Sequence, residues 1–193
     1  MFFEPNVYSQ SIFAEASDLH ENILAVKVDG ATKENLVWGF RVGFLTFASP
    51  GLRGRDEVFE ALSQKVTGAV RATVSNSSTL SQNLLLQAMR SPDYVQEKQR
   101  VFAILQERYR RSREILDSLK GPLRVLPFNS GYFLCFDTGG IGAERLRRKL
   151  LEEEGIGTIS IQDRYLRVAY SSVDVENLEE LYTTIMKAAS DLV

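Results

Sequence analysis

Two cations stand eight residues apart in the segment 29–43, Lys33 and Arg41, among glycines and aromatic residues. Apolar runs on both sides of the segment predict two buried strands. A lysine amine in a desolvated site can form a covalent bond with an aldehyde, and a guanidinium offers a fork of donors that suits a phosphate. The alternative is that both cations are solvated surface groups, because short patterns of this kind often have no functional meaning.

The segment resembles the cofactor-lysine region of class I/II aminotransferases, which are fold-type I enzymes that depend on pyridoxal 5′-phosphate. In that family the lysine bonds covalently to the cofactor, and an arginine eight residues later, followed by Val-Gly, binds the cofactor phosphate. Lys33 and Arg41 match in residue type, spacing and the Val-Gly that follows. Many members have a small hydroxyl residue three positions before the lysine. Gly30 stands there in this chain, and Thr32 offers a hydroxyl in its place.

Arg71 opens the run Arg-Ala-Thr-Val-Ser-Asn. In the aspartate-type branch of the same family, a similar segment reaches the active site from the neighbouring subunit. Its arginine contacts the distal carboxylate of dicarboxylic substrates, so the resemblance makes Arg71 a substrate-binding residue. The alternative is that Arg71 only favours the C-terminal end of its helix through the helix dipole.

Arg167 lies in an alternating apolar run that is followed by Val-Ala-Tyr. This run resembles the strand of the family whose arginine binds the substrate α-carboxylate through two hydrogen bonds. The alternatives are a solvent-facing arginine on a half-buried strand, or a shifted register in which Arg164 takes the role. We prefer Arg167 because of the Val-Ala-Tyr that follows it.

Strands and helices alternate along the chain, which predicts an α/β fold with an α+β small domain. The resemblance implies the C-terminal half of the fold-type I transferase fold, with a remnant of the large cofactor-binding domain at 1–91 and the small C-terminal domain at 92–193. One long amphipathic helix, 95–119, begins after Ser91-Pro92-Asp93 and ends at Gly121-Pro122. The other predicted helices are 8–21, 55–70, 80–90, 144–153 and 176–189, and the predicted strands are 22–29, 42–48, 123–128, 132–136, 156–161 and 165–169.

Other reactive residues have structural interpretations. Cys135 in its apolar run predicts a buried thiol, Phe133 predicts packing, and the arginines of 108–113 alternate with glutamates, which predicts a solvated helix face. One cysteine and one histidine, His20, exclude an internal disulfide and a Cys/His zinc cluster, so no metal is expected.

The net charge of −2 over 193 residues offers no basic field for nucleic acid. No apolar run reaches the roughly 20 residues of a membrane span, and no signal-peptide pattern is visible. We therefore expect a cytoplasmic protein that binds neither nucleic acid nor membrane.

The resemblance implies that the parent enzyme transaminates an amino acid to a 2-oxo acid as a homodimer. It covers only the C-terminal half of a typical member, so we expect this chain to be a fragment, inactive alone, with the acid and tyrosine that face the cofactor ring upstream of Met1. Two alternatives stay open: a pyridoxal-phosphate-dependent β-elimination lyase of the same fold, and a non-catalytic truncated module for dimerisation or binding. The exposed edge of a truncated sheet predicts pairing between copies, a swap, or poor order over the first ~30 residues.

Overall fold

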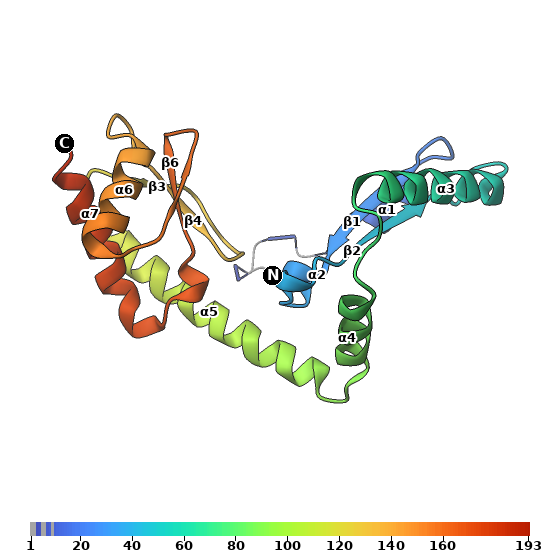
Figure 1. Ribbon diagram of the computed structural model, residues 1–193, viewed down its shortest axis with the longest axis horizontal. Helices are drawn as coiled ribbons and strands as arrows, with labels where there is room; N and C mark the ends of the chain where they lie inside the picture. The colour runs from blue at the N-terminus through green and yellow to red at the C-terminus, as the bar shows by residue number, and fades with distance from the viewer. Residues whose placement is uncertain (1–2, 5–6, 9) are drawn as a thin grey trace. The chain divides into compact units, whose positions relative to one another are not determined.

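The computed structural model describes residues 3–4, 7–8 and 10–193. By their contacts these residues form two compact units. The first is Tyr8–Lys98, and the second is Gln99–Val193 together with the described residues before Tyr8. Each unit has its own sheet and its own core (Figure 1). The domain limits expected from the sequence, 1–91 and 92–193, stay a prediction beside this division by contacts.

An antiparallel hairpin forms the sheet of the first unit. Strand β1 (Ala25–Gly30) pairs with β2 (Gly43–Ala48), with Ala25 opposite Ala48 and Gly30 opposite Gly43. Both strands were predicted, and β1 begins three residues later than the predicted start. The connector holds a single helical turn, α2 (Ala31–Glu34), and a 3-10 turn, η1 (Trp38–Phe40). A small core of Ala31, Val42 and Leu85 closes this end of the hairpin.

Three further helices belong to this unit: α1 (Phe13–Asp18), α3 (Arg55–Thr73) and α4 (Thr79–Arg90). Helix α1 is shorter than the predicted 8–21. Ile12 and Leu19, on the predicted apolar face, are exposed, so packing does not stabilise the helix at either end. The Ser-rich loop before α4 supplies its cap, since the Ser78 hydroxyl accepts a hydrogen bond from the Ser81 amide.

The second unit is a four-stranded antiparallel sheet with helices packed on one face (Figure 1). Its strand order is β3 (Arg124–Val125), β4 (Leu134–Asp137), β6 (Tyr165–Val168) and β5 (Ile159–Ile161). Alternate residues of β4 and β6 are buried against helices α6 (Ala143–Glu154) and α7 (Leu178–Ser190) and against the second part of α5 (Tyr94–Ser118). The buried strand residues are Leu134, Phe136, Leu166 and Val168.

The helix ends of this unit follow the sequence more closely than the strands do. Helix α6 ends at Gly155, whose φ of 68° is the left-handed conformation that glycine adopts readily. Strand β3 has only two residues instead of the predicted six, and Pro127, which lacks an amide donor, falls in the part that does not pair. Asp174 has a residue type that favours a helix cap and lies two residues before the predicted helix 176–189, but its side chain makes no cap; its carboxylate accepts a hydrogen bond from Arg108 instead.

The arginines of 108–113 are not a purely solvated face, and this prediction was wrong. Arg108 donates to the Ser171 carbonyl and to Asp174, and Arg111 contacts Glu179 on α7 at 2.6 Å. Arg113 lies 5.6 Å from the ring of Phe128. These side chains tie α5 to the segment that leads into α7, because both elements border the same core.

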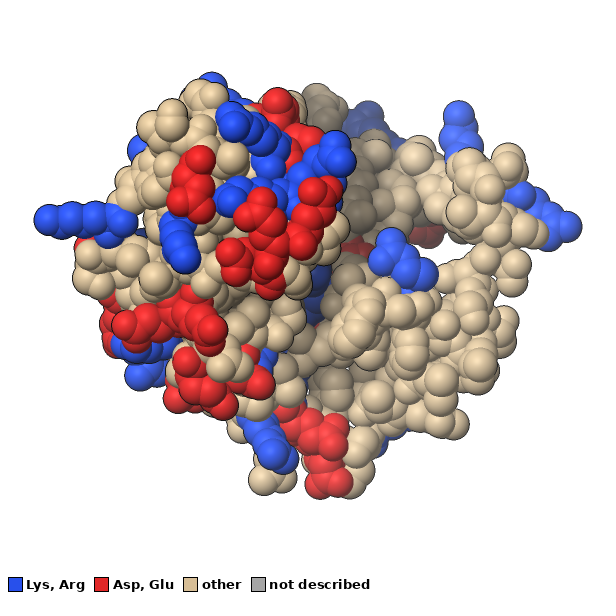
Figure 2. Space-filling view, turned by 60° about the vertical axis from the view of Figure 1, so that its left-hand side comes forward, with Lys and Arg blue, Asp and Glu red and all other residues tan. Residues whose placement is uncertain are grey.

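Acidic and basic side chains are interspersed on the face of the molecule that Figure 2 shows. Within the described ranges, none of the helices combines the length and the apolarity that a membrane crossing requires.

Candidate active site

The hairpin brings the two ends of the Lys33–Arg41 loop together. The Ala31 amide donates to the Val42 carbonyl at 3.0 Å, and Gly30 is paired with Gly43. Thr32 and Lys33 therefore leave β1 at the same end of the hairpin at which Arg41 enters β2. Lys33 and Arg41 are both exposed, so both are accessible to a ligand at this end of the strands.

Backbone geometry sets the direction of the returning loop. Leu36 and Arg41 both adopt the left-handed region, with φ of 60° and 52°. Such conformations cost non-glycine residues about 1 kcal/mol or more and concentrate at functional sites. Gly43 follows at a close approach of the strands, since a Cβ there would lie 3.2 Å from the Asp29 carbonyl oxygen. The glycine of the Arg-Val-Gly run is therefore explained by the limited space beside the Asp29 carbonyl.

The helical turn that carries Lys33 is held by the start of α5, within the same unit. The Asn35 amide donates to the Tyr94 hydroxyl. Glu34 contacts Lys98 at 2.6 Å, and this hydrogen bond raises the pKa of Lys98. Because the two residues after Lys33 are fixed in this way, the backbone position of Lys33 is set by contacts far along the sequence.

Arg71 lies in the last turn of α3 and is exposed. Its guanidinium donates to the Ser75 hydroxyl at 3.0 Å, and Ser75 is itself left-handed with a φ of 69°. The structure therefore shows a local helix-end contact for Arg71, and its role toward a substrate stays a prediction.

Arg167 lies on β6, on the sheet face opposite the core. It is paired with Cys135 of β4 on one side and with Ile159 of β5 on the other. Its guanidinium carbon lies 4.6 Å from the centre of the Phe133 ring. The Arg167 Nε is buried and has no hydrogen-bond partner among the described residues. A buried donor without a partner is costly, and a bound acceptor would satisfy it.

Arg164 is engaged elsewhere. It lies in the turn before β6, and its guanidinium contacts the Asp137 carboxylate at 3.2 Å. Arg164 thus uses part of its guanidinium in an ion pair, whereas the Arg167 Nε has no hydrogen-bond partner among the described residues. The choice of Arg167 as the arginine that binds a substrate stays a prediction.

Phe133 and Cys135 surround Arg167 in a way that sequence reasoning missed. Phe133, for which the sequence predicted packing, is partly exposed, and its ring packs against the Arg167 guanidinium. Cys135 is half-buried; burial raises the pKa of its thiol, and the neighbouring Arg167 charge opposes that shift. The strict alternation of β4 and β6 was the signal that could have placed Phe133, Cys135 and Arg167 on one sheet face.

These residues could bind an aldehyde cofactor with an anionic group and a carboxylate substrate. Lys33 and Arg41 share one end of the hairpin, and Arg167 belongs to the other unit. In the part of the chain that the structure describes, no group of His, Cys, Asp and Glu could hold a metal ion.

Comparisons with known proteins give one family. The family described as "Aminotransferase class I and II" matches residues 3–185. A search of curated proteins finds no match. Several solved structures are similar in fold.

An aminotransferase from Anaerococcus prevotii is 23% identical, with 91% of this chain and 40% of that chain covered and a TM-score of 0.69. LysN, an α-aminoadipate aminotransferase from Thermus thermophilus solved with N-(5′-phosphopyridoxyl)-L-leucine, is 21% identical, with coverage of 99% and 48% and a TM-score of 0.73. The aromatic aminotransferase from Pyrococcus horikoshii is 16% identical, with coverage of 100% and 50% and a TM-score of 0.70.

At these identities the likeness concerns the fold, and it confirms the predicted fold class. The chain spans 40% to 50% of the length of these three structures.

Proposed function

Because the chain belongs to the class I and II aminotransferases, a pyridoxal-phosphate-dependent family, we propose that it contributes to the transamination of an amino acid to a 2-oxo acid. The observation that carries the proposal is the hairpin end that joins Lys33 and Arg41 within the matched residues 3–185. Since the chain spans only part of its structural relatives, the activity of a whole family member belongs to the proposal.

Lys33 has the central role in this proposal. When bound, pyridoxal phosphate supplies the electron sink for charge at the substrate α-carbon. Lys33 Nζ would hold the cofactor at its aldehyde group. The same Nζ, when free, would accept the proton from the substrate α-carbon as a general base.

Each arginine in this proposal binds a different anionic group of the cofactor or the substrate. Arg41, exposed at the loop end, binds the cofactor phosphate, and the hydroxyl of Thr32, on the helical turn that carries Lys33, assists it. Arg167 binds the substrate α-carboxylate, because its Nε is a buried donor without a described partner and its guanidinium is held against Phe133. Arg71 binds a distal carboxylate in the neighbouring copy of a homodimer.

Borohydride trapping tests the cofactor assignment. Borohydride reduces a bond between lysine and cofactor to a stable amine, which peptide mass mapping then locates. We expect the label on Lys33 in the full chain and its loss in Lys33→Arg. Lys65→Arg, on the exposed face of α3, is the matched control and leaves the yield unchanged.

Arg41→Gln tests the phosphate role in the same assay. Loss of a charge-assisted contact predicts about tenfold more cofactor for the same yield of label. A label on another lysine, or no label on any lysine at saturating cofactor, would overturn the proposal and favour a non-catalytic module.

A further inference from the structure

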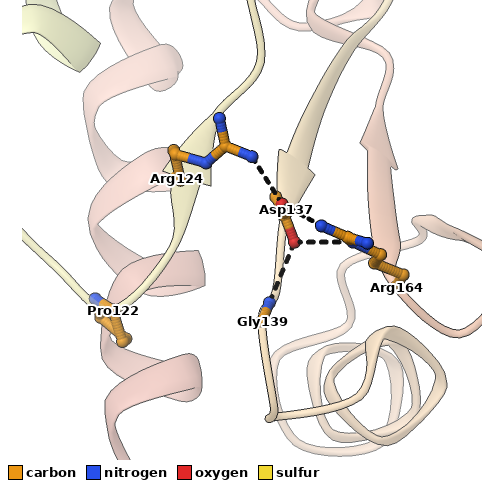
Figure 3. A pocket seen from close by; sticks show the side chains of 5 residues that line it. All are labelled: Pro122, Arg124, Asp137, Gly139 and Arg164. Atoms are coloured by element: carbon orange, nitrogen blue, oxygen red, sulfur yellow. Dashed lines mark hydrogen bonds and ion pairs between the residues drawn. The ribbon is translucent and has the colours of Figure 1, made fainter.

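A cavity of about 430 Å³ opens at the end of β4 in the second unit, and its lining includes none of the residues proposed for catalysis. Pro122, Arg124, Asp137, Gly139 and Arg164 line it (Figure 3). Figure 3 shows Arg124 on β3 and Arg164 before β6 approaching Asp137 from opposite sides. The cavity thus has two cations and one anion in its wall.

Asp137 is the fixed centre of this cluster, with only 8% of its side chain exposed. Its carboxylate accepts from Arg124 at 2.7 Å, from Arg164 at 3.2 and 3.4 Å, and from the Gly139 amide at 3.1 Å. The hydrogen bonds from Arg164, Arg124 and the Gly139 amide hold the pKa of Asp137 well below its usual range. Asp137 therefore stays ionised at neutral pH and keeps both guanidiniums in place.

The two guanidiniums are far from saturated by this contact. Each has five N–H donors; Arg124 uses one toward Asp137, and Arg164 uses two. Their side chains remain 69% and 59% exposed, so the other donors are open to a ligand. Two positive charges against one negative charge leave an excess of one positive charge at the cavity.

The backbone fixes both arginines from different directions. Arg124 is paired with Asp137 across β3 and β4. Arg164 follows a tight turn in which Gln162 and Asp163 are left-handed, with φ of 53° and 49°. The Arg164 carbonyl also accepts from the Thr138 amide and hydroxyl, both at 2.9 Å. A ligand would therefore meet donors that are already ordered, which reduces the entropy lost on binding.

Asp163, the acidic residue directly before Arg164, has a hydrogen-bond partner of its own. Asp163 accepts a hydrogen bond at 2.7 Å from the Glu144 amide, in the first turn of α6. Glu144 pairs with Arg147 at 2.7 Å. These contacts hold the two carboxylates beside α6, and no contact with Arg124 or Arg164 is found for either among the described residues.

We propose that this cavity binds a small oxyanion, a phosphate or carboxylate group, through the outward donors of Arg124 and Arg164 that Asp137 orders. The fork of a guanidinium matches two oxygens of either group. None of the residues proposed for transamination lines this cavity, so we assign it to an anionic ligand other than the reacting groups.

Titration of the full chain with inorganic phosphate, and separately with citrate, tests the site. The readout is the set of arginine Nε–Hε signals in ¹⁵N NMR spectra, assigned through Arg124→Gln and Arg164→Gln. We expect saturable shifts of both signals, at constant ionic strength, with one of the two anions binding more tightly. Tighter binding of phosphate would identify a phosphate ligand, and tighter binding of citrate a carboxylate ligand.

Arg124→Gln should weaken binding about tenfold, because it removes one guanidinium and the excess charge. Arg124→Lys keeps the positive charge but loses the two-donor geometry of the guanidinium, so its affinity for the anion should lie between those of the unchanged chain and Arg124→Gln. Arg148→Gln is the matched control, since Arg148 is an exposed arginine with one carboxylate partner on α6, and it should leave binding unchanged. Shifts that do not saturate, or an equal loss in Arg148→Gln, would overturn the proposal. Borohydride labelling does not involve these residues, so either proposal can fail without the other.

Discussion

A buried hydrogen bond joins α5 to α7 in the unit that presents Arg167. The Tyr182 hydroxyl donates to the Ser112 hydroxyl at 2.8 Å, and both side chains are completely buried. Burial raises the pKa of Tyr182 to about 12, so its hydroxyl remains a donor. The Tyr182 ring also packs edge-on against Phe136 of β4. We therefore choose this pair to test how the core supports the sheet.

Removing either partner should destabilise the second unit by about 1–3 kcal/mol, because it leaves the other hydroxyl buried and unsatisfied. Tyr182→Phe should lie at the lower end, since a helical serine can turn its hydroxyl to a backbone carbonyl of the preceding turn. Ser112→Ala should lie at the upper end, because the tyrosine hydroxyl has no such freedom. The double variant should cost no more than the worse single change, which gives a coupling of about 1–2 kcal/mol.

Native-state hydrogen exchange at the amides of α7 and β6 measures this in the full chain, because it reports the free energy of opening of one unit. Tyr165→Phe is the control. The Tyr165 hydroxyl makes no hydrogen bond within the described ranges, so its loss should change stability by less than about 0.5 kcal/mol. If the loss of stability in the double variant equals the sum of the two single losses, the two hydroxyls do not interact, and the proposed role of their hydrogen bond is wrong.

Three further predictions follow from the contacts. The pKa of Asp137 is lowered in the folded state, so the ionised carboxylate should stabilise the fold above the unfolded pKa of about 4, and this effect should be lost as the pH falls below that value. Denaturation at several pH values measures it: the free energy of unfolding should fall less with acid in Asp137→Asn than in the unchanged chain. Arg108→Gln should destabilise the second unit by about 1–2 kcal/mol, measured by exchange at α7, because it removes the Asp174 contact; Arg110→Gln, on the exposed side, should not. The exposed apolar face of β1 and β2 should pair between copies, so light scattering should show association that Val28→Lys reduces; a monomer at all concentrations would contradict this.

Local features of the fold were predictable because they depend on residues only a few positions apart. The long helix, with Tyr109 and Leu116 in the core, followed from its period. The Ser78 cap and the end of α6 at Gly155 followed from residue type. The strands were less predictable in extent, because pairing depends on a partner from elsewhere in the chain.

For the candidate site, the sequence by itself determined the residue types and the spacing. The eight residues from Lys33 to Arg41, between two strands, and the Arg-Val-Gly run can all be read along the chain, since they belong to one local segment.

Only the tertiary structure decided what each arginine contacts. Arg164 and Arg167 are three residues apart on one turn and strand, and the sequence preferred Arg167 from its neighbours without showing what either side chain contacts. The fold places Asp137 beside Arg164 and Phe133 beside Arg167. Ion pairs and buried donors depend on which distant strands become neighbours, and that choice is made by the packing of the whole unit.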